Sequence, residues 1–381
     1  MPARVAWSGT APRKAPEGPP RPECGHRNAR ARAVRTRPGE RTLERMTRQA
    51  GPEGGTIERR VVLRGAAGAL LGAAAAGCTG GGSPRHTPGS PSATASPTGS
   101  PVPGALPRTT PWRPTSAEVD PEVKLRAVQL VEAIGAWPAG KGGTAAAEAR
   151  VAALRLPTGL VGQAGTLLPS ADAAALQVVD AQYGGILTDA SSVLVVCRQW
   201  TRHGARIVAG GTTVDVRLVR TGSAWTVTAL HPAQPGAAVG SPSAAVRAVL
   251  ADTRIVLPPA AEADLRSGLV HDSVPSAMLW LARTYRMEVS VVRSGHPLNV
   301  FGTNRPSDHP RGRAFDVWRI DGRAVVDPAA PRTLVERFMR DAAAAGSYNV
   351  GGPVQLSGGA TSGQFFSDDT HHDHVHIGFL R

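Results

Sequence analysis

The sequence is poor in cysteine and in aromatic side chains, which limits the kinds of fold and partner to expect. Its 381 residues include three cysteines, Cys24, Cys78 and Cys197, which form no CxxC motif and show no disulfide framework. Cys197 lies in the apolar run SSVLVVCRQW, which predicts a buried strand residue with an inert thiol. Aromatic residues make up only 4% of the chain.

The chain also has little net positive charge outside its N-terminal segment, although its total net charge is +14. Residues 1–60 alone carry +8, and the chain from Cys78 onward carries only +5, with no basic block beside aromatic residues. Binding of nucleic acid needs a basic face, usually with stacking side chains. We therefore expect no nucleic-acid partner.

Residues 46–78 contain the parts of an export signal in the usual order. Arg59 and Arg60 precede an uncharged apolar stretch, 65–77, which is shorter than the roughly 20 residues of a membrane-spanning helix. The stretch ends in AAGC. This segment resembles a twin-arginine lipoprotein signal, which implies export, cleavage before Cys78 and a lipid anchor on its thiol. The alternative is an Ala-rich segment in which the cysteine is accidental.

The flanking segments are low in complexity. Residues 1–45 are rich in Arg and Pro and are expected to be disordered or to precede the true start. Residues 79–115 are rich in Pro, Ser, Thr and Gly, a composition typical of an extended linker. A lipid anchor followed by such a linker would place the folded part on the outer face of the cell membrane, facing the cell wall.

Two small α+β domains are expected after the linker. Residues 116–236 begin with helical periodicity in PEVKLRAVQLVEAIGAW and TAAAEARVAALRL and continue with strand patterns in SSVLVVCRQWTR, TTVDVRLVR and AWTVTALHP. Helices followed by antiparallel strands indicate an α+β fold. No chemistry is assigned to this first domain.

Residues 243–381 form the second expected domain, with helices and an antiparallel sheet. Its predicted strands include RAFDVWRI and RAVVD, joined by the two-residue turn Asp321-Gly322. A helix over PRTLVERFMRDAAAAG has proline at its start and Gly346 at its end. DHVHIGFL is the predicted closing strand.

Four histidines in SDDTHHDHVHIGFLR, together with an earlier His and Asp, indicate a metal site. His309 and Asp316 are seven residues apart, and Pro310 and Gly312 allow the histidine to lie on a loop ahead of the strand with Asp316. His374 and His376 are two residues apart and share a strand face. A His/His/carboxylate set suits zinc better than calcium or magnesium. An affinity tag is disfavoured because the cluster is interrupted and is followed by IGFL.

SDHPRGRAFD resembles the SxHxxGxAxD motif of zinc D-alanyl-D-alanine carboxypeptidases. DHVH resembles that family's ExxH element in spacing, with Asp373 in place of Glu, and also the HxH of the wider group with lysostaphin-type endopeptidases and hedgehog domains. The resemblance covers about residues 245–381. The matched motif positions are Ser307, His309, Gly312, Ala314 and Asp316.

By resemblance, His309, Asp316 and His376 are the zinc ligands. Ser307 is a candidate for orienting one of these ligands. Two candidates remain for the general base: the ExxH alignment favours Asp373, whereas strand parity and the HxH alignment favour His374. Both contribute if one orients the other.

The family's SGxR arginine is missing, since the chain has SGHP at that place. Arg293 and Arg305 are the nearby candidates to bind a substrate carboxylate or the oxyanion, and Arg305 is closer to the motif. His271 and His296 lack partners at ligand spacing and are assigned no metal role.

These features predict a zinc metallopeptidase that hydrolyses peptidoglycan stem peptides with a metal-activated water. Its activity would be that of a D-Ala-D-Ala carboxypeptidase or of a cross-link endopeptidase. The alternative is an inactive lipoprotein that keeps the fold and binds wall peptides or a partner protein.

Overall fold

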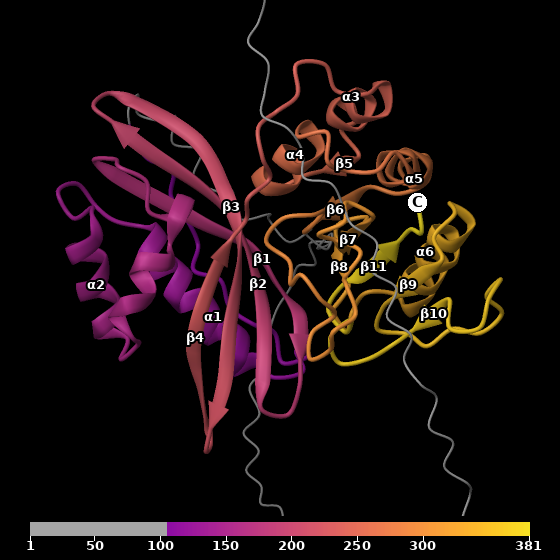
Figure 1. Cartoon of the computed structure of the whole chain (residues 1–381), viewed down its shortest axis with the longest axis horizontal. Helices are drawn as coiled ribbons and strands as arrows, with labels where there is room; N and C mark the ends of the chain where they lie inside the picture. Colours follow the sequence, from indigo (N-terminus) through magenta and orange to yellow (C-terminus); the bar gives the residue numbers. More distant parts are fainter. Residues whose placement is uncertain (1–104) are drawn as a thin grey trace, which may run out of the picture. The chain divides into compact units, whose positions relative to one another are not determined.

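The computed structural model describes residues 105–381 (Figure 1). The predicted signal with Cys78, the segment 1–45 and most of the linker lie outside these residues. Within the described part of the chain, no helix is both long enough and apolar enough to cross a bilayer. The described residues combine helices with an antiparallel and a mixed sheet, which confirms the α+β class.

A four-stranded antiparallel sheet and its helices form what we call the four-stranded unit, residues 121–232 (Figure 1). Two helices come first, as predicted, and two short 3₁₀ turns follow at Thr158–Gln163 and Gly165–Leu167. The strands pair in sequence order, so each is joined to the next by a short turn. The elements are α1 (Pro121–Gly135), α2 (Thr144–Ala153), β1 (Ala173–Ile186), β2 (Ala190–His203), β3 (Arg206–Thr221) and β4 (Ala224–Pro232).

Helix α1 packs on this sheet through an apolar stripe. Pro121 occupies the first turn, where its missing N–H leaves no hydrogen bond unmade. Val123, Ala127 and Val131 recur at helical spacing and are fully buried in one core with the strands. Lys124 lies on the same buried face. A lysine at a core position must be paired with an acid, and its partners belong to the site described below.

The end of the predicted linker is anchored on the four-stranded unit. Thr110 accepts a hydrogen bond from the side chain of Gln177 and donates one to it, at 2.9 and 2.8 Å. Trp112 packs against the core beside α1. Thr110 and Trp112 therefore contact the unit, within the segment 79–115 that was predicted to be an extended linker, because Trp112 supplies apolar surface to the core.

Residues 244–378 form the seven-stranded unit, with its own hydrophobic core. Its strand order is β10-β9-β11-β7-β6-β5, with β8 paired to β7. The four-stranded unit and the seven-stranded unit belong to the same compact part of the chain. The elements are α3 (Ala244–Ala251), β5 (Ile255–Val256), α4 (Pro259–Arg266), α5 (Ser273–Ala282), β6 (Met287–Val289), β7 (Ala314–Ile320), β8 (Arg323–Ala324), α6 (Arg332–Ala344), β9 (Asn349–Gly351), β10 (Phe365–Phe366) and β11 (Val375–Gly378).

The second sheet is mixed, which corrects the predicted antiparallel sheet. Its central strands β6, β7, β11 and β9 pair antiparallel, but β5 pairs parallel with β6 and β10 pairs parallel with β9. Parallel neighbours need a long crossover. Helices α4 and α5 provide it between β5 and β6, and residues 352–364 provide it between β9 and β10.

Two local signals in this unit are confirmed. Asp321 and Gly322 have positive φ angles of 49° and 78° and turn β7 into β8, as a two-residue hairpin requires. Helix α6 begins directly after Pro331 and ends before Gly346, whose φ is 100°.

Candidate metal centre

Strand pairing brings Asp316 and His376 together. Asp316 lies on β7 and His376 on β11, and the register of this antiparallel pair places the two residues directly opposite each other. Opposed residues of neighbouring strands project from the same sheet face. His376 Nδ1 is 3.0 Å from Asp316 Oδ1.

His309 reaches the same point from the loop before β7. Gly312 turns this loop back, with a φ of 70° and a backbone N–H that donates to the His309 carbonyl at 2.8 Å. The Nδ1–H of His309 donates to the Val292 carbonyl at 2.8 Å. That hydrogen bond fixes the tautomer and leaves the Nε2 lone pair directed at Asp316 and His376.

The three ligand atoms form a nearly equilateral triangle. His309 Nε2 is 3.1 Å from Asp316 Oδ1 and 3.1 Å from His376 Nδ1, and the third side measures 3.0 Å. Zinc bonds of about 2.0–2.1 Å in a tetrahedron place ligands roughly 3.3–3.4 Å apart. A shift of a few tenths of an ångström would therefore fit these donors to such an ion.

The charge state of the donors suits a cation. Burial raises the pKa of Asp316, but the neighbouring His309 and His374 outweigh burial and hold that pKa well below its usual value. Burial, reinforced by His309, outweighs the hydrogen bond and the charge of Asp316 and lowers the pKa of His376 to about 4. Near neutral pH the site thus offers a carboxylate and a neutral imidazole, the forms that bind metal ions.

His296 belongs to this cluster, which corrects the prediction that it has no metal role. Its ligand atom lies within 4.8 Å of those of His309 and Asp316, so these three residues could hold a metal ion. The His296 ring stacks on that of His309, with centroids 4.1 Å apart, and its Nδ1–H donates to the Pro297 carbonyl. The sequence pattern missed it because His296 has no histidine or acid near it along the chain. His271 lies outside the cluster.

Asp373 and His374 form a hydrogen-bonded pair beside the triangle. The Nδ1–H of His374 donates to Asp373 Oδ1 at 2.5 Å, and its Nε2 lies 3.8 Å from Asp316 Oδ2. Burial lowers the pKa of His374, but the carboxylates of Asp316 and Asp373 outweigh burial and raise it to about 8. Both residues precede β11, which begins at Val375, so strand parity does not govern them. The geometry makes Asp373 the orienting group and leaves His374 facing the cleft.

The four-stranded unit supplies one wall of this site. The Gln182 amide donates to Asp316 Oδ2 at 2.6 Å. The backbone N–H of Tyr183 donates to Asp373 Oδ2 at 3.1 Å. Both residues lie on β1, an edge strand with register shifts at 178/180 and 183/185. Such bulges redirect side chains, and an edge strand has free N–H groups to pair with another element.

Two glycines of β1 allow the loop 296–302 to lie against the strand. A Cβ on Gly185 would fall 2.1 Å from Cβ of Phe301, and one on Gly184 would fall 3.0 Å from Cδ of Pro297. Any larger residue at Gly185 would push the loop away from β1. The close approach helps to fix His296 over His309.

The metal cluster opens into a cavity of about 670 Å³ between β1, the loop before β7 and the segment 361–371. Arg305 is exposed and lines this cavity, so a ligand can reach its guanidinium. Across the floor, the Tyr348 hydroxyl donates to Asp308 Oδ2 at 2.6 Å. The cavity is large enough for a short peptide.

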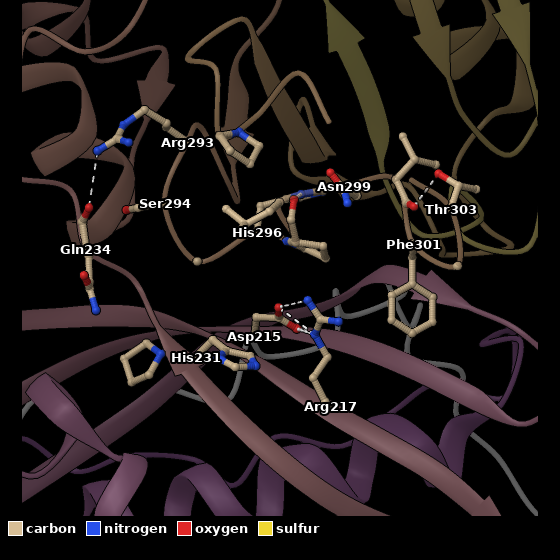
Figure 2. Close-up of a pocket in the computed structure, with 17 residues that line it drawn as sticks. Asp215, Arg217, His231, Gln234, Arg293, Ser294, His296, Asn299, Phe301 and Thr303 are labelled. Atoms are coloured by element: carbon tan, nitrogen blue, oxygen red, sulfur yellow. Dashed lines mark hydrogen bonds and ion pairs between the residues drawn. The ribbon is translucent and has the colours of Figure 1, made fainter. Parts of the chain in front are cut away.

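A second cavity, of about 560 Å³, lies between β3, β4 and the loop that contains residues 296–302 (Figure 2). Figure 2 shows Arg293 directed to Gln234 on one wall and Arg217 paired with Asp215 on the other. Arg293 also donates to the Pro235 carbonyl at 2.8 Å. This arginine therefore lies away from the metal cavity, which leaves Arg305 as the cleft arginine of the two candidates.

Three further side chains of the two sequence motifs have defined contacts. Ser307 is buried, and its Oγ lies 3.4 Å from His296 Nδ1, so it contacts His296 and not one of the three ligands predicted from the motif. His371 lines the cavity and is held by Asp368 at 2.6 Å. His372 donates to the Ala117 carbonyl at 2.6 Å, a contact with the segment that precedes α1.

Comparison with protein-family models, curated proteins and solved structures found no match for the chain.

Proposed function

We propose that this protein is a zinc-dependent metallopeptidase that hydrolyses peptide bonds in peptidoglycan stem peptides. One observation carries the proposal: His309 Nε2, Asp316 Oδ1 and His376 Nδ1 lie 3.0–3.1 Å from one another at the floor of a peptide-sized cavity. If His296 stays beside these three ligands without binding the ion, a position is left open, which is typical of catalytic zinc, whereas structural sites are usually closed by four.

The donor chemistry favours zinc among the common ions. Two imidazoles and one carboxylate are borderline ligands, whereas calcium and magnesium take mostly oxygen ligands. His309 is locked in one tautomer by the Val292 carbonyl. Gln182 likewise restrains the free oxygen of Asp316. The ligands are thus oriented in advance, as metal sites with high affinity require.

The chain's own groups divide the chemistry among them. When bound, the metal ion polarises the scissile carbonyl and lowers the pKa of a water molecule. The neutral form of His374, which predominates above its pKa of about 8, accepts the proton of the attacking water at Nε2, because its Nδ1–H is held by Asp373. The same imidazolium then returns the proton to the leaving amine, which completes the hydrolysis of one amide bond.

The cleft and the sequence both support a wall peptide as the substrate. Arg305 on the cavity wall can bind a peptide carboxylate through two parallel hydrogen bonds. The SxHxxGxAxD resemblance and the twin-arginine lipoprotein signal ending at Cys78 support a substrate outside the cell, in the wall. Removal of a terminal D-Ala and cleavage of a cross-link both fit this cavity.

The missing SGxR arginine favours a second candidate, a lipoprotein that binds wall peptides without cleaving them. Pro297 stands where that arginine would follow His296, and it offers no positive charge. Arg305 then serves recognition alone, without stabilising a transition state.

Incubation of the full chain with muropeptides, with and without Zn²⁺, separates the two candidates. Mass spectrometry of the products should show a zinc-dependent loss of D-Ala or a split cross-link. Asp316→Asn should abolish both zinc retention and cleavage. Asp308→Asn is the matched control in the same cavity and should retain zinc. Tight peptide binding without cleavage would favour the binding protein, and unchanged zinc in Asp316→Asn would refute the site.

A further inference from the structure

Lys124 is a fully buried lysine whose ammonium lies among acidic side chains. It lies on the core face of α1 and is 0% exposed. Its ammonium contacts Glu118 and lies 2.6 Å from Asp373 Oδ2. The same ammonium lies 4.8 Å from the centroid of the Tyr183 ring. A buried charge of this kind is destabilising unless partners hold it, so its retention calls for a reason.

The partner of Lys124 is the orienting carboxylate of the cleft. Asp373 Oδ1 accepts from His374 Nδ1 at 2.5 Å. Asp373 Oδ2 is held by Lys124 at 2.6 Å and by the Tyr183 N–H at 3.1 Å. Two groups of the four-stranded unit therefore restrain one oxygen, and the other oxygen restrains the histidine.

This arrangement leaves Asp373 no freedom to rotate. If the ammonium were removed, Oδ2 would keep only one backbone donor, and the carboxylate could turn its oxygens away from the ring. The Nδ1–H bond defines both the plane of the imidazole and its tautomer. Loss of that bond would allow the ring proton to move from Nδ1 to Nε2. Nε2 would then have no lone pair to accept a proton from water.

We propose that Lys124 is a positioning residue for His374, acting through Asp373, and that the four-stranded unit is thereby part of the metal cleft. The role assigned to His374 rests on the proposed function. The coupling of Lys124 to the imidazole rests only on the contacts between them.

The test replaces the ammonium and follows the histidine. Lys124→Met keeps the length and the apolar contacts but removes the charge, and Lys124→Arg keeps the charge. Arg126→Met, two positions along the same helix, is the matched control because Arg126 forms no ion pair in the described part of the chain. Each full-length protein is assayed for bound zinc, for kcat and KM on muropeptides, and for melting temperature.

Histidine N–H signals in the NMR spectrum of the metal-free protein provide a readout that does not need activity. The hydrogen-bonded Nδ1–H of His374 is assigned by its loss in His374→Gln. In Lys124→Met we expect this signal to disappear or to move, kcat to fall on the order of 10–100-fold, and KM and bound zinc to stay within about twofold. Lys124→Arg should recover part of kcat and of the signal, and Arg126→Met should match the wild type.

An unchanged His374 signal in folded Lys124→Met would overturn the proposal, whatever the activity. If Lys124→Arg lost as much kcat as Lys124→Met, and both variants also lost zinc, Lys124 would be only one half of a structural ion pair and the proposal would be wrong. If Lys124→Met does not fold, the double variant Lys124→Met, Glu118→Gln decides, because it removes one of the two carboxylates left unpaired while Asp373 still loses its ammonium partner. A weakened signal would support the proposal, and an unchanged one would refute it. A wild type without hydrolysis would remove the proposed function but leave the NMR comparison intact.

Discussion

Gln182 and Asp316 are joined by a hydrogen bond of 2.6 Å that links the edge strand of one sheet to the centre of the other. The amide oxygen of Gln182 is in turn held by the Ser290 hydroxyl, so the NH₂ group has a fixed direction. Asp316 therefore presents Oδ1 to His309 while Oδ2 stays with Gln182. The carboxylate is oriented before any ion arrives.

We predict that Gln182→Met weakens zinc binding by about 10–100-fold, because Asp316 loses the donor that orients it. Competition with a chromogenic chelator measures the change. Gln177→Met on the same strand is the control, since Gln177 pairs with Thr110 and not with the cleft. Equal affinities in both variants would show that the hydrogen bond does not orient the ligand.

His374→Gln should lower kcat on the order of 10²–10⁴-fold while the protein keeps its zinc. The substitution removes the proposed proton acceptor of the cleft but leaves His309, Asp316 and His376 in place. Steady-state kinetics and metal analysis of the same sample check this. His371→Gln, which alters a neighbouring cavity residue, should have a much smaller effect. Near-wild-type turnover in His374→Gln would assign the base role elsewhere.

Gly312→Ala should destabilise the fold by about 1–3 kcal/mol, measured by urea unfolding. The residue has a φ of 70°, which favours glycine, and an added Cβ would lie 2.1 Å from the Leu269 carbonyl oxygen. Gly322→Ala is a milder comparison, because its φ is also positive but no atom lies within 4 Å of the added Cβ. Equal losses in the two variants would mean that the carbonyl contact is unimportant.

Asp180 should make a contribution to the free energy of unfolding that falls as the pH rises from about 4 to 7. Burial raises its pKa to about 7, against an ordinary value of about 4 in the unfolded chain. Its Oδ2 is buried without a hydrogen-bond partner. Between these values the unfolded chain releases a proton that the folded chain retains, so the contribution is complete below about pH 4 and lost above about pH 7. The ionisable groups that influence it are Lys124, Asp373, Glu118 and His374.

Asp180→Asn should therefore gain stability over the wild type by roughly 2–4 kcal/mol more at pH 8 than at pH 4. Urea unfolding at several pH values gives the comparison. Asp189→Asn, an exposed carboxylate in the turn after β1, should show no such trend. A constant difference across the range would mean that Asp180 titrates normally.

The parts of the fold that the sequence predicted are those where local pattern and burial agree. Helices α1 and α6 have apolar stripes and proline at their starts, and Asp321-Gly322 has the residues of a hairpin turn. Strand β1 was not predicted. Its run AAALQVVDAQYGGI carries Asp180 and Gln182, which interrupt the apolar pattern because they face the second unit instead of water.

The site divides in the same way. His309, Asp316 and His376 could be predicted from the sequence because two of them lie in a compact motif and the third lies in a histidine-rich segment. The roles of His296 and Lys124 could not be predicted, since each contacts its partners only after distant segments pack together. No pattern along the chain encodes such contacts, and only the folded arrangement shows them.

The hydrogen bonds between β1 and the cleft join residues 134 and 190 positions apart in the chain. Closing loops of this length has an entropic cost that only contacts formed within each sheet beforehand can offset. The cleft should therefore be the last region to organise during refolding. Strands and helices would appear first, and the ability to hold a metal ion would lag behind them, so that capture of the ion reports the completed chain rather than either half.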